Sequence, residues 1–301
     1  METEHQSIAP TSGVGAVHLE VTDGPRALRF YRDYVGLAQL PVDDGAIHLG
    51  AAGRELVVLH PGASAPVEPH HTGLYHLAIV VPDKRELARV IGRLEALRWP
   101  QYPTDHVMTK ANYIWDPDGN GIEIYTESPE DGTWSMQGGD YFAVDAQGRH
   151  RSGRDPIDME ELFSHIKEGD NLADPLPAGT RMGHVHLHVR DIDEALRFYA
   201  DLVGFDLMGV AMGSMAFVSA GGYHHHLGLN IWAGRGVPPR PEGSSGLRHF
   251  TIEVPTERDL EEVVERLDRG EVKLTEGDGA FAAVDPSANH VRIAVRAPGG
   301  A

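Results

Sequence analysis

The chain has 301 residues, a length typical of about two domains, and its content of 41% hydrophobic and 24% charged residues is ordinary for a soluble globular protein. The formal net charge of −19 argues against binding to nucleic acid or to anionic membranes. Because the chain contains no Cys, disulfides and thiolate ligands are excluded, and His, Asp or Glu must hold any metal. The N-terminal segment lacks the basic and apolar regions of a signal peptide, so a cytoplasmic protein is expected.

The first repeated element pairs a strand with a helix. Val14–Leu37 matches Met182–Phe205 position for position, and each copy contains an alternating strand and the helical sequence Leu-Arg-Phe-Tyr. Each helix is expected to begin after an Asp at the N-cap position and to end at a Gly. These positions are Asp23 and Asp191, and Gly36 and Gly204.

A second repeated element follows each copy of the first. Gly73–Leu97 resembles Gly246–Gly270, and the later sequence DPDGNGIEI corresponds to DPSANHVRI. The chain is therefore predicted to be an α+β protein of four βαβββ units, in which helices cover the outside of curved mixed sheets. The predicted ranges are a first domain at 12–127 (unit one 14–63, unit two 73–127), a linker at 128–180 with a short helix in Pro156–Lys167, and a second domain at 181–297 (unit three 182–233, unit four 246–297).

The first strand of each unit carries His on its polar face. In unit one, Val17, Leu19 and Val21 face one side and His18 faces the other, because side chains alternate along a strand. If helices cover the apolar side, these His line the inside of a curved sheet, here called a cup. The equivalent residues are His18, His76, His186 and His249, and the strand of unit three also has His184 and His188 on this face.

A hairpin in unit two supplies a carboxylate. Asn112–Trp115 and Ile122–Tyr125 read as two strands joined by the turn sequence DPDGNG. Ile122 and Ile124 share one face, and Glu123 lies on the other, where burial is costly unless the carboxylate is paired or binds a cation. Two His and one carboxylate leave open positions on a metal, which suits non-heme Fe(II) and O2 chemistry.

These motifs resemble those of the vicinal oxygen chelate superfamily, which includes glyoxalases, bleomycin-resistance proteins and type I extradiol dioxygenases. Thr104–Glu123 is close to the extradiol dioxygenase signature, although Asn112 stands where that family usually has an aliphatic residue. GLYHLAIVVP, DPDGNGIEIY and SAGGYHHHLGLNIWAG are similar to bacterial catechol-2,3-dioxygenase-like proteins with two such domains, over nearly the full length.

The resemblance implies Fe(II) held by two first-strand His and Glu123. It also implies that Tyr113 hydrogen-bonds a substrate hydroxyl, that His106 lies near it, and that a His of the run Tyr223–His226 is the acid–base catalyst. Alternation back from Leu227 places His224 and His226 in the cup, whereas alignment to the family's His-His pair favours His225. Both His225 and His226 therefore stay candidates.

The pairing of the units decides which His joins Glu123. If neighbouring units pair, the ligands are His18, His76 and Glu123. If units pair crosswise, two with three and one with four, the ligands are His76, Glu123 and His186. We favour the crosswise pairing because it collects the family's motifs in one cup and leaves the other with His18, His249 and Arg292.

The predicted function is an Fe(II)-dependent extradiol dioxygenase that cleaves a catechol-like aromatic diol with O2. The alternatives are a glyoxalase-type isomerase or lyase, and a metal-free drug-binding protein of the bleomycin-resistance type. Mn or Zn could replace Fe in a purified sample, because affinity alone does not select the metal. No nucleic-acid or membrane partner is expected, and a homodimer is compatible with the outer edges of such cups.

Overall fold

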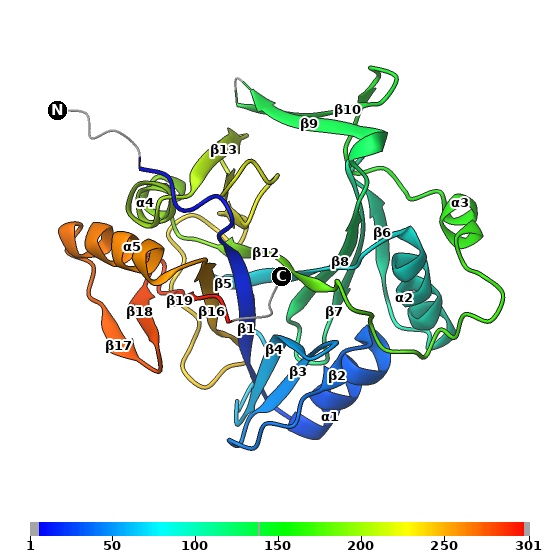
Figure 1. Ribbon diagram of the computed structural model, residues 1–301, viewed down its shortest axis with the longest axis horizontal. Coiled ribbons are helices and arrows are strands. Elements are labelled where there is room, and N and C mark those ends of the chain that lie inside the picture. Colours follow the sequence, from blue (N-terminus) through cyan, green and yellow to red (C-terminus); the bar gives the residue numbers. More distant parts are fainter. Residues whose placement is uncertain (1–5, 138, 298–301) are drawn as a thin grey trace.

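The computed structural model describes residues 6–137 and 139–297 as two eight-stranded sheets, one three-stranded sheet and a few helices (Figure 1). The predicted α+β class is confirmed. None of the helices in these residues is long and apolar enough to cross a membrane. The N-terminal segment, for which the sequence predicts no signal peptide, lies partly outside the described residues.

The first large sheet combines units four and one. Its strands, in spatial order, are β17 (Thr275–Gly277), β18 (Ala280–Val284), β19 (His290–Val295), β16 (Gly246–Val254), β1 (Gly13–Val21), β4 (Arg54–Pro61), β3 (Ile47–Ala51) and β2 (Ala38–Gln39).

The second large sheet combines units three and two. Its strands, in spatial order, are β13 (Asp206–Ala211), β14 (Met215–Ser219), β15 (Leu227–Asn230), β12 (Arg181–His188), β5 (Gly73–Val80), β8 (Gly121–Glu127), β7 (Thr109–Trp115) and β6 (Tyr102–Asp105).

The units therefore pair crosswise. At the centre of one sheet β1 runs antiparallel to β16, with His18 opposite His249. At the centre of the other, β12 runs antiparallel to β5, with His186 opposite His76. Each sheet thus takes strands from both halves of the chain, and Glu123 shares a cup with unit three.

Helices pack on the outer faces of the sheets (Figure 1). The apolar faces of the first strands, such as Val17 and Leu19 of β1, are fully buried in the shared core. The helices are α1 (Gly24–Arg29), η1 (Phe30–Val35), α2 (Lys84–Ala96), η2 (Pro129–Asp131), α3 (Met159–Ser164), α4 (Ile192–Leu196), η3 (Arg197–Val203) and α5 (Glu257–Arg269).

The predicted ends of the repeated helices are confirmed. The Asp23 carboxylate accepts a hydrogen bond from the backbone N–H of Arg26, and Asp191 accepts from the first turn of α4. Gly36 and Gly204 close these helices with φ of 97° and 100°, a left-handed conformation that favours glycine.

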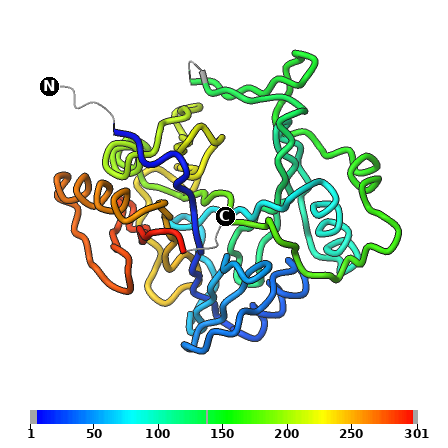
Figure 2. The backbone as a smooth tube through the Cα atoms, viewed as in Figure 1, coloured from blue at the N-terminus to red at the C-terminus, as the bar shows by residue number. Residues whose placement is uncertain are grey.

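The segment between the halves forms more structure than the sequence predicts. It contains α3, inside the stretch expected to be helical, and an unpredicted sheet of β11 (His150–Arg151), β10 (Asp140–Asp145) and β9 (Gly132–Gln137). The chain then passes along α2 (Figure 2), where Arg89 donates to the carbonyl oxygens of Asn171 and Asp174, each at 3.0 Å. At the other end, the Met212 N–H of unit three donates to the Gly139 carbonyl at 2.8 Å. The segment thus contacts both halves.

Candidate metal centre

The β7–β8 hairpin positions Glu123. Its turn is held by Asp116, whose Oδ1 accepts hydrogen bonds from the backbone N–H groups of Asp118 and Asn120 at 2.9 and 2.8 Å. Tyr113 then pairs directly with Glu123 across the ladder. The neighbours of Glu123 on β8 are fully buried in the core on the other face, so the carboxylate, 3% exposed, points into the cup.

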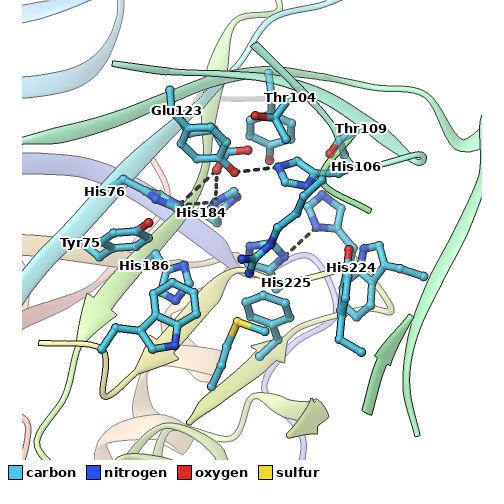
Figure 3. A pocket seen from close by; sticks show the side chains of 18 of the residues that line it. Tyr75, His76, Thr104, His106, Thr109, Glu123, His184, His186, His224 and His225 are labelled. Atoms are coloured by element: carbon cyan, nitrogen blue, oxygen red, sulfur yellow. Dashed lines mark hydrogen bonds and ion pairs between the residues drawn. The ribbon is translucent and has the colours of Figure 1, made fainter. Parts of the chain in front are cut away.

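Three side chains from three strands converge there. His76 Nε2 and His184 Nε2 each lie 3.1 Å from Glu123 Oε2, and 3.1 Å from one another (Figure 3). With metal–ligand bonds of about 2.1 Å, neighbouring ligands of an octahedral metal lie about 3.0 Å apart. The three atoms therefore match one face of an octahedron, which is the arrangement of the 2-His-1-carboxylate site of non-heme Fe(II) oxygenases.

The protonation states of these residues also suit a cation. Burial raises the pKa of Glu123, but the adjacent His184 and His76 outweigh it, and the pKa lies well below its ordinary value. Burial lowers the pKa of His184 to about 4, although Glu123 acts against this shift. An ionised carboxylate and a neutral imidazole are the forms that bind metals.

His184, and not the expected His186, contacts Glu123. The His186 ring is in the same pocket, 5.0 Å from the ring of His76, but it packs against Tyr75 and Trp232, and its buried Nε2 has no hydrogen-bond partner among the described residues. Among these residues, only His76, Glu123 and His184 form a group able to hold a metal.

A spacing in the sequence identifies His184. His76 lies seven residues before the N-cap Asp83, and His184 lies seven residues before the N-cap Asp191. The same position of unit one is Ala16, so His18 is not equivalent to either ligand. The observed pair of His76 and His184 is predicted when the strands are aligned on their helix caps. Alignment on the similarity of Val17–Val21 to Val185–Val189 instead matches His18 with His186.

Tyr113 and His106 form a half-buried hydrogen-bonded pair beside the triad. His106 Nδ1 lies 2.6 Å from the Gly153 carbonyl and must donate to it, and Nε2 lies 2.9 Å from the Tyr113 hydroxyl. Burial lowers the pKa of His106, so the ring is neutral and its Nε2 accepts a hydrogen bond from the Tyr113 hydroxyl. Burial and then Glu123 raise the pKa of Tyr113 well above its ordinary value, which keeps the phenol protonated.

The His run divides between two cavities. His225 lines the metal pocket with its ring 4.1 Å from that of His184, and His224 lines it too while contacting Glu127 at 3.2 Å. His226 lines a different cavity. The prediction from strand alternation that His226 lies in the same cup as His224 is therefore wrong. Alternation does not apply here because β15 begins only at Leu227, and the preceding residues form a loop. Burial lowers the pKa of His225 well below its ordinary value, so it is a neutral imidazole facing the pocket.

The pocket has a volume of about 290 Å³ and largely aromatic walls. The segment between the halves contributes Trp134, Tyr141 and Arg154, and unit three contributes Phe217 and Trp232. Arg154 lies 5.9 Å over the Trp232 ring and has no ion pair among the described residues. Sequence reasoning missed this wall because nothing in the composition of residues 128–180 shows where the segment folds back.

Known proteins are similar to this chain in sequence and in fold. The family model described as Glyoxalase/Bleomycin resistance protein/Dioxygenase superfamily matches residues 13–124 and 181–283. The chain belongs to this superfamily, as its resemblance implied.

One relative is much more similar in sequence than the two solved structures described after it. The catechol-2,3-dioxygenase of Bacillus subtilis (strain 168) is 39% identical over 284 residues, which cover 93% of this chain and 96% of that protein. A solved structure from Bacillus subtilis, 16% identical, superposes with a TM-score of 0.66 over 98% of this chain and 87% of its own. Glyoxalase I of Zea mays, also 16% identical, gives 0.54 over 94% and 92%. The two structures support the fold alone.

Proposed function

We propose that this protein is an Fe(II)-dependent extradiol dioxygenase, which cleaves the ring of a catechol-like substrate and inserts both atoms of O2. The observation that carries the proposal is the triangle of His76 Nε2, His184 Nε2 and Glu123 Oε2, with three sides of 3.1 Å. The 39% identical relative named catechol-2,3-dioxygenase supports the same chemistry. We propose His184 as the third ligand in place of His186.

Bound Fe(II) would supply open positions for the diol and O2 and would lower the pKa of a bound hydroxyl. His225, neutral and facing the pocket, can accept a substrate proton and return it later. Tyr113, held by His106, can orient a substrate oxygen while staying protonated. The aromatic walls stack on a planar ring and exclude water.

The glyoxalase-type isomerase is the second candidate. The resemblance implies that glyoxalases use a fourth protein ligand, typically a second carboxylate. In the described part of the chain, no further Asp or Glu joins the group around Glu123. The drug-binding alternative requires no metal and leaves the converging His76, His184 and Glu123 without a role.

The test is anaerobic purification, loading with Fe(II), Mn(II) or Zn(II) in separate samples, and measurement of metal content and catechol-dependent O2 uptake. We expect one Fe per chain and one O2 consumed per catechol, and loss of both in Glu123→Gln. One metal per chain without O2 uptake on any catechol would refute the dioxygenase and favour the isomerase. No metal in any sample would favour the binding protein. Gel filtration in the same preparation tests the predicted homodimer.

A further inference from the structure

A second cavity lies where the two large sheets meet. It has a volume of about 260 Å³ and is lined by the start of β1 and by β4 from one sheet, and by β12 and the loop before β15 from the other. His226, the member of the His run that faces away from the metal pocket, also lines it.

Three guanidinium groups line this cavity in a chain whose net charge is −19. They belong to Arg54, Arg181 and Arg296, which come from β4, from β12 and from the residue after β19. The pKa of Arg54 is lowered by burial and, despite Glu253, by the charges of Arg296 and Arg181. The cations therefore repel one another across the cavity.

The carboxylates nearby do not balance these charges. Glu253 Oε2 lies 3.6 Å from Arg54 and 3.3 Å from Arg296. Arg181 instead lies 5.3 Å over the ring of Tyr223, and the nearby Glu127 accepts from that tyrosine's hydroxyl and does not line the cavity. The lining thus holds three guanidiniums and no carboxylate, and the two carboxylates beside it, Glu253 and Glu127, leave an excess of positive charge.

The neutral groups of the lining add hydrogen-bond donors. His226 Nδ1 accepts the backbone N–H of Ala220 at 3.1 Å and the Ser219 hydroxyl at 3.0 Å, so its proton must be on Nε2. No hydrogen bond to Nε2 is present within the described residues. The buried Ser12 Oγ likewise has no partner among them.

A glycine keeps this corner open. A Cβ on Gly13 would lie 3.5 Å from His226 Nε2 and 3.7 Å from Arg296 Nη2, so any larger side chain would cover both donors. Donors from both sheets therefore border one space, with the excess of positive charge that a small dianion would neutralise.

We propose that this cavity binds a small oxyanion of the phosphate class, either inorganic phosphate or the phosphate group of a monoester. Arginine suits this ligand because its planar fork of N–H groups matches phosphate oxygens in pairs. A monocarboxylate carries less negative charge than a phosphate dianion and would neutralise less of this excess. The bound anion would also join the two sheets, because its donors come from both. The proposal does not depend on the proposed oxygenase activity.

The experiment is titration calorimetry and thermal unfolding of the full chain, loaded with metal, at constant ionic strength. The ligands are inorganic phosphate, glycerol 3-phosphate and, as a monoanion, acetate. We expect saturable binding of phosphate with one site per chain, a rise in Tm, and much weaker binding of acetate. Tighter binding of glycerol 3-phosphate than of inorganic phosphate would identify a monoester as the ligand.

Arg54→Gln and Arg296→Gln are each expected to weaken phosphate binding at least about tenfold, because each removes a charged hydrogen-bond donor. Ser12→Ala removes a single neutral donor and tests the site if an Arg variant does not fold; we expect a few-fold loss. The matched control is Arg258→Gln on α5, where Arg258 is 86% exposed and pairs with Glu262. The variants also separate this cavity from the metal, since phosphate bound to the metal would remain in Arg54→Gln.

Three results would overturn the proposal. They are no saturable binding of phosphate to the folded wild type, equal binding by wild type and all three cavity variants, and binding of acetate as tight as that of phosphate.

Discussion

His184→Ala separates the two possible ligand sets around Glu123. The substitution removes a nitrogen that lies 3.1 Å from both Glu123 Oε2 and His76 Nε2. His186→Ala is the matched control, because His186 is equally buried in the same pocket but its Nε2 has no hydrogen-bond partner among the described residues.

The expected size of the effect follows from the number of ligands. Four-ligand zinc sites bind their metal with roughly 10–16 kcal/mol, or about 3 kcal/mol for each ligand. Loss of one of the three protein ligands should therefore weaken metal binding by at least about 100-fold. The His186 variant loses packing against Tyr75 and Trp232 and should keep its metal.

The assay is metal content after dialysis against a graded series of chelator concentrations, with circular dichroism as the check on folding. O2 uptake is recorded on the same samples. Retention of wild-type affinity by His184→Ala, together with loss in His186→Ala, would refute the assignment and restore His186 as the ligand.

Three further predictions concern the pocket and the buried histidines. Tyr113→Phe should keep its metal and lose about 100-fold in kcat, measured by O2 uptake, because it removes a hydroxyl oxygen that His106 holds in place and that can accept a hydrogen bond from a substrate hydroxyl; an unchanged kcat would exclude that role. Arg154→Gln should raise KM about tenfold for catechols that carry a carboxylate and leave KM for catechol itself unchanged; an equal change for both would count against charge recognition. Burial lowers the pKa of His226 to about 3 and of His249 to about 4, so between pH 6.5 and these values the unfolded chain binds more protons and stability falls as the pH falls. Each such His should lower the free energy of unfolding by up to about 1.4 kcal/mol per pH unit in this range. The urea midpoint of the metal-free protein should thus be lower at pH 5 than at pH 7, and an equal or higher midpoint at pH 5 would contradict this.

The elements that local chemistry determines could be predicted from the sequence. The turn DPDGNG and the two short apolar strands around it place Glu123 on the face of its strand that points away from the core, and the structure shows that arrangement. The Asp and Gly at the ends of the repeated helices are equally local signals. In each case, the residues that decide the geometry are within a few positions of one another.

The residues that were harder to predict depend on register or on distant contacts. The strand β12 has His at alternate positions, so side-chain parity places His184 and His186 on one face and cannot choose between them. Its pairing with β5 also shifts register between Met182 and His184, and again after His186. Only the distance to the helix cap distinguishes the two. The walls of the pocket from residues 128–180 depend on tertiary packing against β13, which no short sequence pattern encodes.

The duplicated architecture explains why one cup carries the proposed metal ligands and the other does not. Crosswise pairing brings unit one to unit four, where Ala16 stands at the position of a ligand His and Arg292 at that of Glu123. His18 there stacks on His249 at 3.9 Å, and burial followed by the charges of His249, His60 and Arg292 lowers the pKa of His18 to about 2. A guanidinium beside two imidazoles repels a cation. This cup therefore resembles the other in shape but lacks the negative charge that Glu123 provides there. Replacing Arg292 alone by Glu would still leave Ala16 without a donor, and both positions would have to change before this cup had two His and one carboxylate at the positions of His76, His184 and Glu123.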